Sequence, residues 1–219
     1  YRVGVRATPK RQDGMEDVCG AGIGRRGHKL KDAAIIVPTL KKVRTGVTIP
    51  ASVYILPWNR KPNLSRLLKA LCESESRNSL ILRAFREAYD SGRHILALTG
   101  RLSHVAHLVS TLNTVYKIPA RRYVGGMKKD EQEEALKARV IVATYPMAKE
   151  GLDIPRLDTM FLLTPQSRIT QSVGRIMRPH EGKKEPIVVD FIDEQIGLCS
   201  GMFRTRVREY TSLKMETRK

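Results

Sequence analysis

The chain has 219 residues, with 40 Lys and Arg against 22 Asp and Glu, which gives a formal net charge of +18. This length suits one large domain, or one domain and part of a second. The charge points to a polyanionic partner, and no apolar run approaches the length of a membrane span or resembles a secretory signal. We therefore predict an intracellular protein (cytoplasm, nucleus or, if viral, host cell) that binds nucleic acid and not a membrane.

The cysteines and histidines indicate no metal site. Cys19, Cys72 and Cys199 are far apart and form no C-x-x-C pair. His104 and His107 share a helical face, but no second ligand pair accompanies them. Reduced thiols in an intracellular protein are the prediction.

The chain opens with alternating polar and apolar residues from Arg2 to Ala7, which predicts a short strand. Thr8-Pro9 ends that strand, because proline cannot donate to a sheet. Further on, Gly22-x-Gly24-x-x-Gly27 matches a dinucleotide-binding pattern, but no apolar strand precedes it. We interpret this glycine cluster as a basic loop.

Three apolar runs follow at 33–38, 43–49 and 52–57 and predict short strands, broken by Pro38, Pro50 and Pro57. A polar, proline-containing stretch begins at Trp58. We place a linker at 61–78, between the end of a first domain (1–60) and a second domain with a basic tail (79–219).

From residue 80 onward, helical and strand patterns alternate. Helices are predicted at 80–89, 105–115, 130–138 and 169–177, and strands at 94–99, 120–124, 140–144, 159–163 and 186–192. This alternation is typical of an α/β fold with a parallel sheet. The tail at 200–219 is predicted to be a basic helix.

Polar groups or glycines follow three of these strands, where parallel sheets place their ligand contacts. They offer hydroxyls, a guanidinium and backbone amides that glycine leaves accessible, which suit the phosphates of a nucleic-acid strand. The predicted nucleic-acid-binding residues are Thr99, Arg101, Gly125, Gly126 and Thr144.

The segment 171–178 carries two arginines three residues apart, Arg175 and Arg178, with Gln171 on the same side of a predicted helix. Paired guanidinium groups suit a phosphate that gains negative charge during transfer, although a solvated basic helix has the same pattern. Upstream, Gly151 and Asp153 lie in a turn. The carboxylate of Asp153 has two interpretations: it accepts a hydrogen bond from a ribose hydroxyl, or it caps the backbone of its own turn.

These segments carry a resemblance to a known family. Thr144-x6-Gly151-Leu-Asp153, followed by Gln171-x-x-Gly174-Arg175-x-x-Arg178, resembles motifs V and VI of superfamily 2 helicases and translocases. The stretch 5–14 resembles motif III of the XPB- and UvsW-like branch, with Ala-Thr-Pro, an Arg two residues later and Asp-Gly. Residues 96–101 resemble motif IV of that branch.

The resemblance implies a RecA-like parallel sheet flanked by helices, preceded by the tail end of a first RecA-like domain. It implies ATP chemistry at three groups of residues: catalytic Gln171, Arg175 and Arg178, ATP-binding Gly151 and Asp153, and coupling Thr8 and Arg11. The implied partners are nucleic acid, with DNA favoured over RNA, and an N-terminal RecA-like domain of the same chain.

The sequence also departs from the family. It contains no Gly-x4-Gly-Lys-Ser/Thr loop and no Asp-Glu-x-His/Asp box, and Pro146 interrupts the approach to motif V. Because the chain begins at Tyr1, we expect a fragment or processed product, with ATP and Mg²⁺ held mainly by an upstream domain. The chain alone should not hydrolyse ATP. The alternative is a non-catalytic RecA-like module that binds nucleic acid or a ribonucleoprotein.

Overall fold

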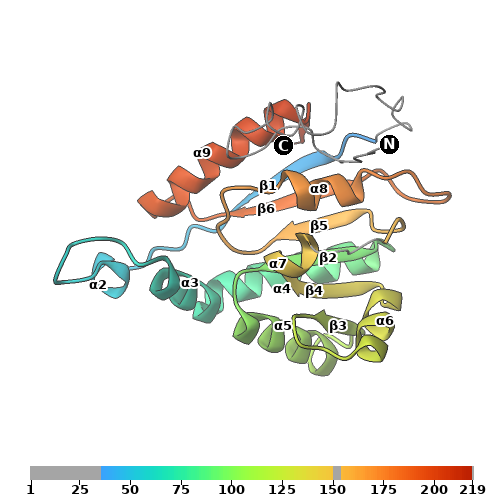
Figure 1. Cartoon of the computed structure of the whole chain (residues 1–219), viewed down its shortest axis with the longest axis horizontal. Helices are drawn as coiled ribbons and strands as arrows, with labels where there is room; N and C mark the ends of the chain where they lie inside the picture. The colour runs from blue at the N-terminus through green and yellow to red at the C-terminus, as the bar shows by residue number, and fades with distance from the viewer. Residues whose placement is uncertain (1–35, 150–153, 219) are drawn as a thin grey trace, which may run out of the picture. The chain divides into compact units, whose positions relative to one another are not determined.

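The computed structural model describes residues 36–149 and 154–218, and residues 34–219 form one compact unit. Its centre is a seven-stranded sheet in the order β3-β4-β2-β5-β6-β1-β7 (Figure 1). Every pair of neighbouring strands is parallel. The strands are β1 (Thr39–Arg44), β2 (Ile95–Thr99), β3 (Ala120–Tyr123), β4 (Val140–Thr144), β5 (Thr159–Leu162), β6 (Ile187–Ile192) and β7 (Thr217–Arg218).

Helices connect the strands, as parallel pairing requires. They are α2 (Ala51–Tyr54), α3 (Leu64–Glu73), α4 (Glu75–Asp90), α5 (Leu102–Thr114), α6 (Lys129–Lys137), α7 (Tyr145–Lys149), α8 (Thr170–Ile176) and α9 (Gly197–Ser212). None of the described helices is long and apolar enough to cross a membrane.

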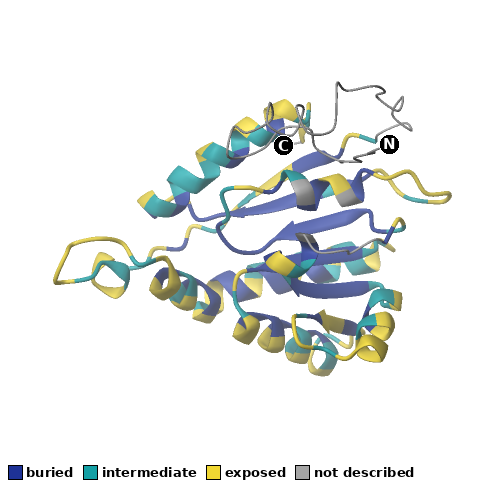
Figure 2. Ribbon diagram, in the orientation of Figure 1, coloured by how far each residue is buried: buried dark blue, intermediate teal, exposed yellow. Residues whose placement is uncertain are grey.

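The sheet buries both of its faces, because successive side chains of a strand point to opposite sides. In β2, Ile95 and Ala97 pack with the apolar residues of α4 and α5, whereas Leu96 and Leu98 pack with those of α6 to α9. Figure 2 shows the result as a buried sheet between helices whose outer sides are exposed. The predicted α/β class with a parallel sheet is confirmed.

The first third of the chain differs from the prediction. β1 lies between β6 and β7, and residues 34–219 form one unit, so residues 36–60 belong to this domain and not to a preceding one. The predicted linker at 61–78 is largely helix α3 and the start of α4. The part of the predicted first domain before residue 36 lies outside the described residues.

The strands predicted in this region also differ from the structure. Of the run at 33–38, residues 33–35 lie outside the described residues and 36–38 are not strand; β1 begins at Thr39, directly after Pro38, which has no N–H to donate. Of the run at 43–49, only Val43 and Arg44 belong to β1. The run at 52–57 forms the one-turn helix α2 and a single bridged residue, Ile55. Neither part belongs to the seven-stranded sheet.

Candidate functional site

Parallel pairing brings the predicted nucleic-acid-binding positions to one edge of the sheet. β2 lies between β4 and β5, and β4 also pairs with β3, so the three connections that follow β2, β3 and β4 begin side by side. Thr99 and Thr144 are register partners at the ends of β2 and β4. We call this the carboxyl edge.

Thr99 does not offer its hydroxyl at this edge. The residue is fully buried, and its Oγ1 lies 2.8 Å from Nδ1 of His104 in α5. His104 Nε2 in turn lies 3.1 Å from Asn78 Oδ1, and Asn78 donates to the backbone carbonyl of Cys72. Burial lowers the pKa of His104 to about 3, so the imidazole is neutral. Thr99 therefore positions the loop after β2 from inside.

The loop after β2 is held closely. The N–H of Gly100 donates to Oγ1 of Thr164 at 2.8 Å, which joins the ends of β2 and β5. A Cβ on Gly100 would lie 3.2 Å from Cδ1 of Leu68, so a larger residue would push against α3. Arg101 is half-buried, and its Nη1 donates to the carbonyl of Ser65 at 3.2 Å. The predicted cation therefore lies against the start of α3.

The loop after β3 suits close approach of a ligand to the backbone. Gly125 and Gly126 are both exposed, and Gly126 has a φ of +80°, which favours glycine. The Cβ position of Gly125 has only the Sδ of Met147 near it, at 3.9 Å. Both glycines are therefore exposed at this edge, and their contact with nucleic acid stays a prediction.

The connection after β4 accommodates the unusual proline. Thr144 is half-buried, and α7 starts at the next residue, Tyr145. Pro146 is the second residue of that helix, where no intrahelical bond needs its missing N–H. The phenolic hydroxyl of Tyr145 donates to the carbonyl of Thr164 at 2.7 Å, so α7 also holds the segment that follows β5.

Helix α8 carries the predicted arginine segment. Gln171 and Arg175 lie within the helix, and Arg178 follows it by two residues. Gly174 is exposed, with open space around its Cβ position. The side chains of Gln171 and Arg175 are not among those described. Thr8, Arg11, Gly151 and Asp153 also lie outside the described residues, so their roles stay predictions.

Opposite charges from two other elements hold the ends of α8. At its start, Oε2 of Glu209 in α9 accepts from the N–H of Ile169 (2.7 Å), and from the N–H (3.0 Å) and hydroxyl (2.9 Å) of Thr170. At its end, Lys183 Nζ donates to the carbonyls of Ile176 (2.8 Å) and Arg178 (2.7 Å). A carboxylate at the start of a helix and an ammonium group at its end both interact favourably with the helix dipole and therefore stabilise the helix.

These two contacts also tie α8 to its surroundings. Lys183 donates to the carbonyl of Pro155, two residues after the predicted motif V segment, at 3.0 Å. On α9, Arg206 donates to the carbonyl of Gln166 at 2.6 Å, and its guanidinium pairs with both oxygens of Asp190 in β6 at 2.9 and 3.0 Å. The sequence predicts the tail only as a basic helix, and no local pattern indicates that Lys183, Arg206 or Glu209 supports α8.

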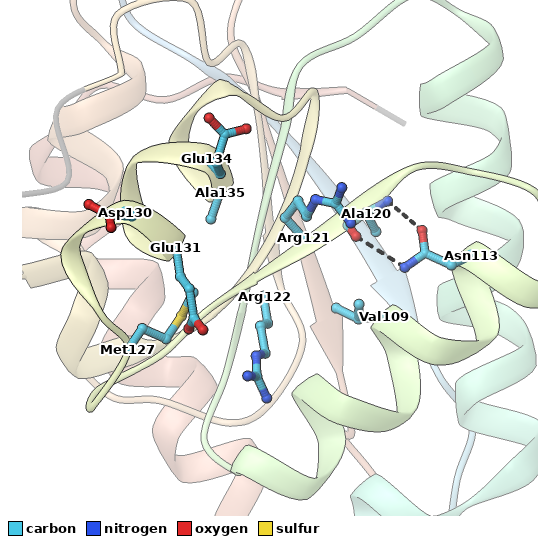
Figure 3. A pocket seen from close by; sticks show the side chains of 10 residues that line it. All are labelled: Val109, Asn113, Ala120, Arg121, Arg122, Met127, Asp130, Glu131, Glu134 and Ala135. Carbon is cyan, nitrogen blue, oxygen red and sulfur yellow. Dashed lines mark hydrogen bonds between the residues drawn. The ribbon is translucent and has the colours of Figure 1, made fainter.

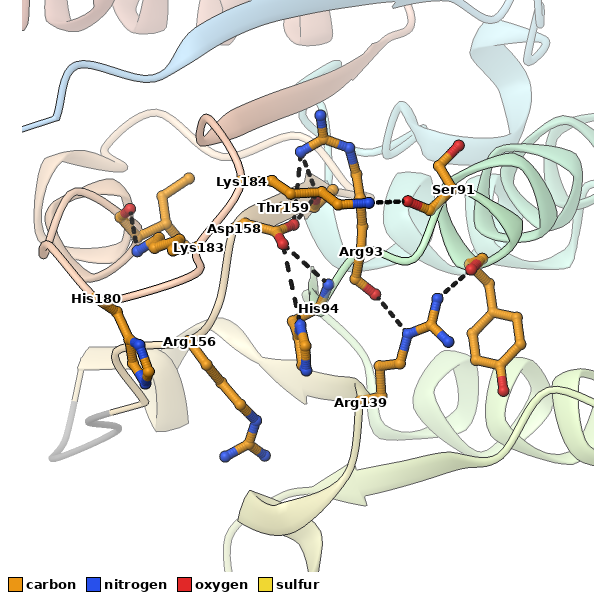
Figure 4. Close-up of polar contacts among 12 residues, drawn as sticks. Ser91, Arg93, His94, Arg139, Arg156, Asp158, Thr159, His180, Lys183 and Lys184 are labelled. Atoms are coloured by element: carbon orange, nitrogen blue, oxygen red, sulfur yellow. Dashed lines mark hydrogen bonds and ion pairs between the residues drawn. The ribbon is translucent and has the colours of Figure 1, made fainter.

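Two other features of the unit lie away from the carboxyl edge. A hollow of about 520 Å³ lies beside the edge strand β3, between α5 and α6 (Figure 3). At the amino ends of the strands, opposite the carboxyl edge, Asp158 contacts Arg93, His94 and Thr159. These contacts hold the starts of β2 and β5 together (Figure 4). Within the described part of the chain, no three His, Cys, Asp or Glu side chains gather as a metal site.

Comparisons with known proteins identify the family of the chain. Residues 62–180 match the family described as the helicase conserved C-terminal domain. An Acanthamoeba polyphaga mimivirus protein named as an ATP-dependent RNA helicase is 33% identical over 198 residues, which are 88% of this chain and 38% of that protein. A protein of Escherichia phage T5 named as a helicase is 24% identical over 200 residues, 88% of this chain and 43% of that protein.

The fold also has a solved counterpart. The crystal structure of T4 UvsW matches with a TM-score of 0.64 at 16% identity, over 84% of this chain and 41% of that one. This likeness confirms the predicted RecA-like fold. The chain spans about two fifths of the length of the two curated relatives.

Proposed function

Because the chain belongs to the helicase conserved C-terminal domain family, we propose that it is the second RecA-like motor domain of an ATP-dependent nucleic-acid helicase or translocase. The observation that carries this proposal is helix α8, whose two ends are fixed by Glu209 and Lys183. Both caps come from outside the helix, so they fix the position of the arginine-bearing segment as well as satisfying its end groups. Delivery of guanidinium groups to a reacting phosphate requires such a fixed position.

In this proposal Arg175 and Arg178, with Gln171, act on the γ-phosphate of ATP across a cleft between two domains. Bound ATP would supply the phosphoryl group that is transferred. An arginine that stabilises the negative charge on this group in the transition state is worth on the order of 10³–10⁵ in rate in related reactions. Gly151 and Asp153 contact the nucleotide, and Thr8 and Arg11 couple hydrolysis to domain movement. Mg²⁺ and most of the ATP are held by an N-terminal RecA-like domain, since the sequence has no phosphate loop.

The nucleic-acid strand lies along the carboxyl edge in this proposal. Arg101, the exposed amides of Gly125 and Gly126, and Thr144 contact its phosphates, while Thr99 shapes the loop from within. Phosphate contacts of this kind position a strand without separating DNA from RNA. The preference for DNA therefore stays a prediction, tested by comparing DNA and RNA oligonucleotides of one sequence. The buried, unpaired thiols of Cys72 and Cys199 support an intracellular location.

The test is nucleic-acid-stimulated ATPase activity of the full-length protein with Arg178→Ala. We expect turnover to fall by at least about 10³-fold, while binding of single-stranded nucleic acid changes little. Arg204→Ala is the matched control, because Arg204 is an exposed arginine on α9 and its loss removes the same charge. Unchanged turnover in Arg178→Ala would refute the finger assignment. Binding that does not respond to ATP would favour the alternative of a non-catalytic module.

A further inference from the structure

The connection between α2 and α3 is an ordered turn that extends beyond the sheet. Ile55 bridges Pro62 in antiparallel fashion, and the N–H of Leu56 donates to the carbonyl of Lys61 at 2.9 Å. Inside it, the N–H of Arg60 donates back to Leu56 at 2.8 Å, and Arg60 has a positive φ of +52°. We call residues 55–62 the Trp58 turn. Figure 1 shows α2 and this turn projecting away from the sheet, with α3 between them and the strands.

The turn presents an indole to solvent. Trp58 is 70% exposed and is the single tryptophan of the chain. Arg66, in the first turn of α3, places its guanidinium carbon 5.9 Å from the ring centroid, so a cation supports one side of the ring. A large aromatic side chain usually contributes by burial, and this one is held by an ordered turn without being buried.

The surroundings of the indole are basic. From residue 51 to residue 72 the chain has four cations and no Asp or Glu. Arg60, Lys61 and Arg66 are exposed, and no described carboxylate forms an ion pair with any of them. An exposed aromatic ring among unpaired cations is the combination with which proteins hold single-stranded nucleic acid, by stacking a base and contacting its phosphates.

The Trp58 turn is continuous with the carboxyl edge. It leads directly into α3, and Ser65 in the first turn of α3 accepts the hydrogen bond from Arg101. Leu68, one turn further along α3, lies against Gly100. A strand that contacts Arg101 would therefore meet the start of α3 next and the Trp58 turn after it. This continuity favours nucleic acid over a membrane surface or an acidic protein as the occupant.

We propose that Trp58 is a stacking platform for an unpaired base of single-stranded nucleic acid, and that Arg60, Lys61 and Arg66 contact the adjacent phosphates. The proposal rests on the proposed function in one respect, because it extends the strand that lies on the carboxyl edge. It adds a site outside the helicase motifs and specifies the bound form as single-stranded.

Trp58 reports on its own site, because it is the only indole in the chain. We expect its fluorescence to be quenched when the 219-residue chain is titrated with a single-stranded oligothymidylate of about 20 nucleotides, long enough to cross one such domain. A duplex of matched length should quench it much less. Binding is followed in parallel by the anisotropy of a dye on the oligonucleotide.

The variants separate the loss of an aromatic face from the mere removal of an exposed apolar side chain. Trp58→Ala should weaken oligothymidylate binding by about 10-fold, and Trp58→Phe, which keeps an aromatic face, by no more than about 3-fold. Val115→Ala is the matched control, because Val115 is 69% exposed on the connection after α5, and it should bind as the unmodified chain does.

Two results would overturn the assignment of Trp58 while leaving the motor proposal intact. One is oligonucleotide binding, seen by anisotropy, with unchanged Trp58 emission and equal affinity in Trp58→Ala. The other is an emission shift with anionic lipid vesicles but not with the oligonucleotide. The motor proposal is tested separately by the ATPase activity of Arg178→Ala, so the failure of one can be told from the failure of the other.

Discussion

Replacing Glu209 with alanine tests whether α9 holds the arginine-bearing helix. The carboxylate accepts three hydrogen bonds from Ile169 and Thr170, two of them from backbone N–H groups at the start of α8. Loss of an N-terminal cap costs about 0.5–2 kcal/mol, and loss of a carboxylate near a helix start about 0.3–1 kcal/mol. Because the two effects overlap, we expect Glu209→Ala to lower the free energy of unfolding by about 2 kcal/mol.

Thermal unfolding followed by circular dichroism measures this loss. For a chain of this size, 1 kcal/mol corresponds to about 2–4 °C in Tm, so Glu209→Ala should melt about 4–8 °C below the unmodified chain. Glu209→Gln keeps one acceptor oxygen and should lose about half as much. Glu133→Ala, which removes an exposed carboxylate from α6, should change the unfolding free energy by less than about 0.5 kcal/mol. A Tm for Glu209→Ala equal to that of Glu133→Ala would refute the reasoning.

Three further predictions follow from buried groups. Asp190→Asn should lower the free energy of unfolding by about 3–5 kcal/mol, because it leaves a buried guanidinium without its carboxylate, and an unchanged urea midpoint would contradict this. Burial lowers the folded-state pKa of His104 from 6.5 to about 3, so the unfolded chain binds the proton more readily and stability falls as the pH drops from about 6.5 toward 3. Urea titrations should show a loss of about 2 kcal/mol between pH 7 and pH 5 that His104→Gln lacks and the exposed His107→Gln retains. Burial also raises the pKa of the Cys72 thiol to about 11 and that of the Cys199 thiol to about 12. Near pH 8, both thiols should therefore react with a thiol reagent far more slowly in the folded chain than in denaturant. Equal reaction rates in the two conditions would contradict their burial.

The second half of the fold could be predicted from the sequence because its signals are local. Helical spacing and short apolar runs between residues 80 and 192 correspond to observed helices and strands, with boundaries that differ by a few residues. The positions after β2, β3 and β4 could be placed together for the same reason, since parallel strands share one carboxyl edge.

The remainder depends on contacts between distant residues. β1 pairs with β6, whose residues lie about 148 positions later, and no local pattern indicates that pairing. The burial of the Thr99 hydroxyl follows from the central position of β2 and from its contact with His104, in the first turn of the next helix. Glu209 stands among arginines in a basic tail, and only the tertiary structure shows that it caps α8.

Strand β6 positions the residues that cap both ends of the arginine-bearing helix α8. Asp190 in β6 accepts two parallel hydrogen bonds from Arg206, which fix the orientation of the guanidinium group as well as its distance. Glu209 lies three residues after Arg206 and therefore on the same face of α9, so the pair that sets Arg206 also sets the cap of α8.

At the other end of α8, Lys183 lies four residues before β6 begins and caps the C-terminal carbonyls. Neither cap belongs to α8 itself, and both depend on where β6 lies in the sheet. A strand buried on both faces cannot shift without disturbing its neighbours β5 and β1. The position of the arginine segment is therefore set by the core of the sheet. A substitution in β6 can thus displace the proposed ATP-contacting arginines although the substituted residue itself does not contact ATP.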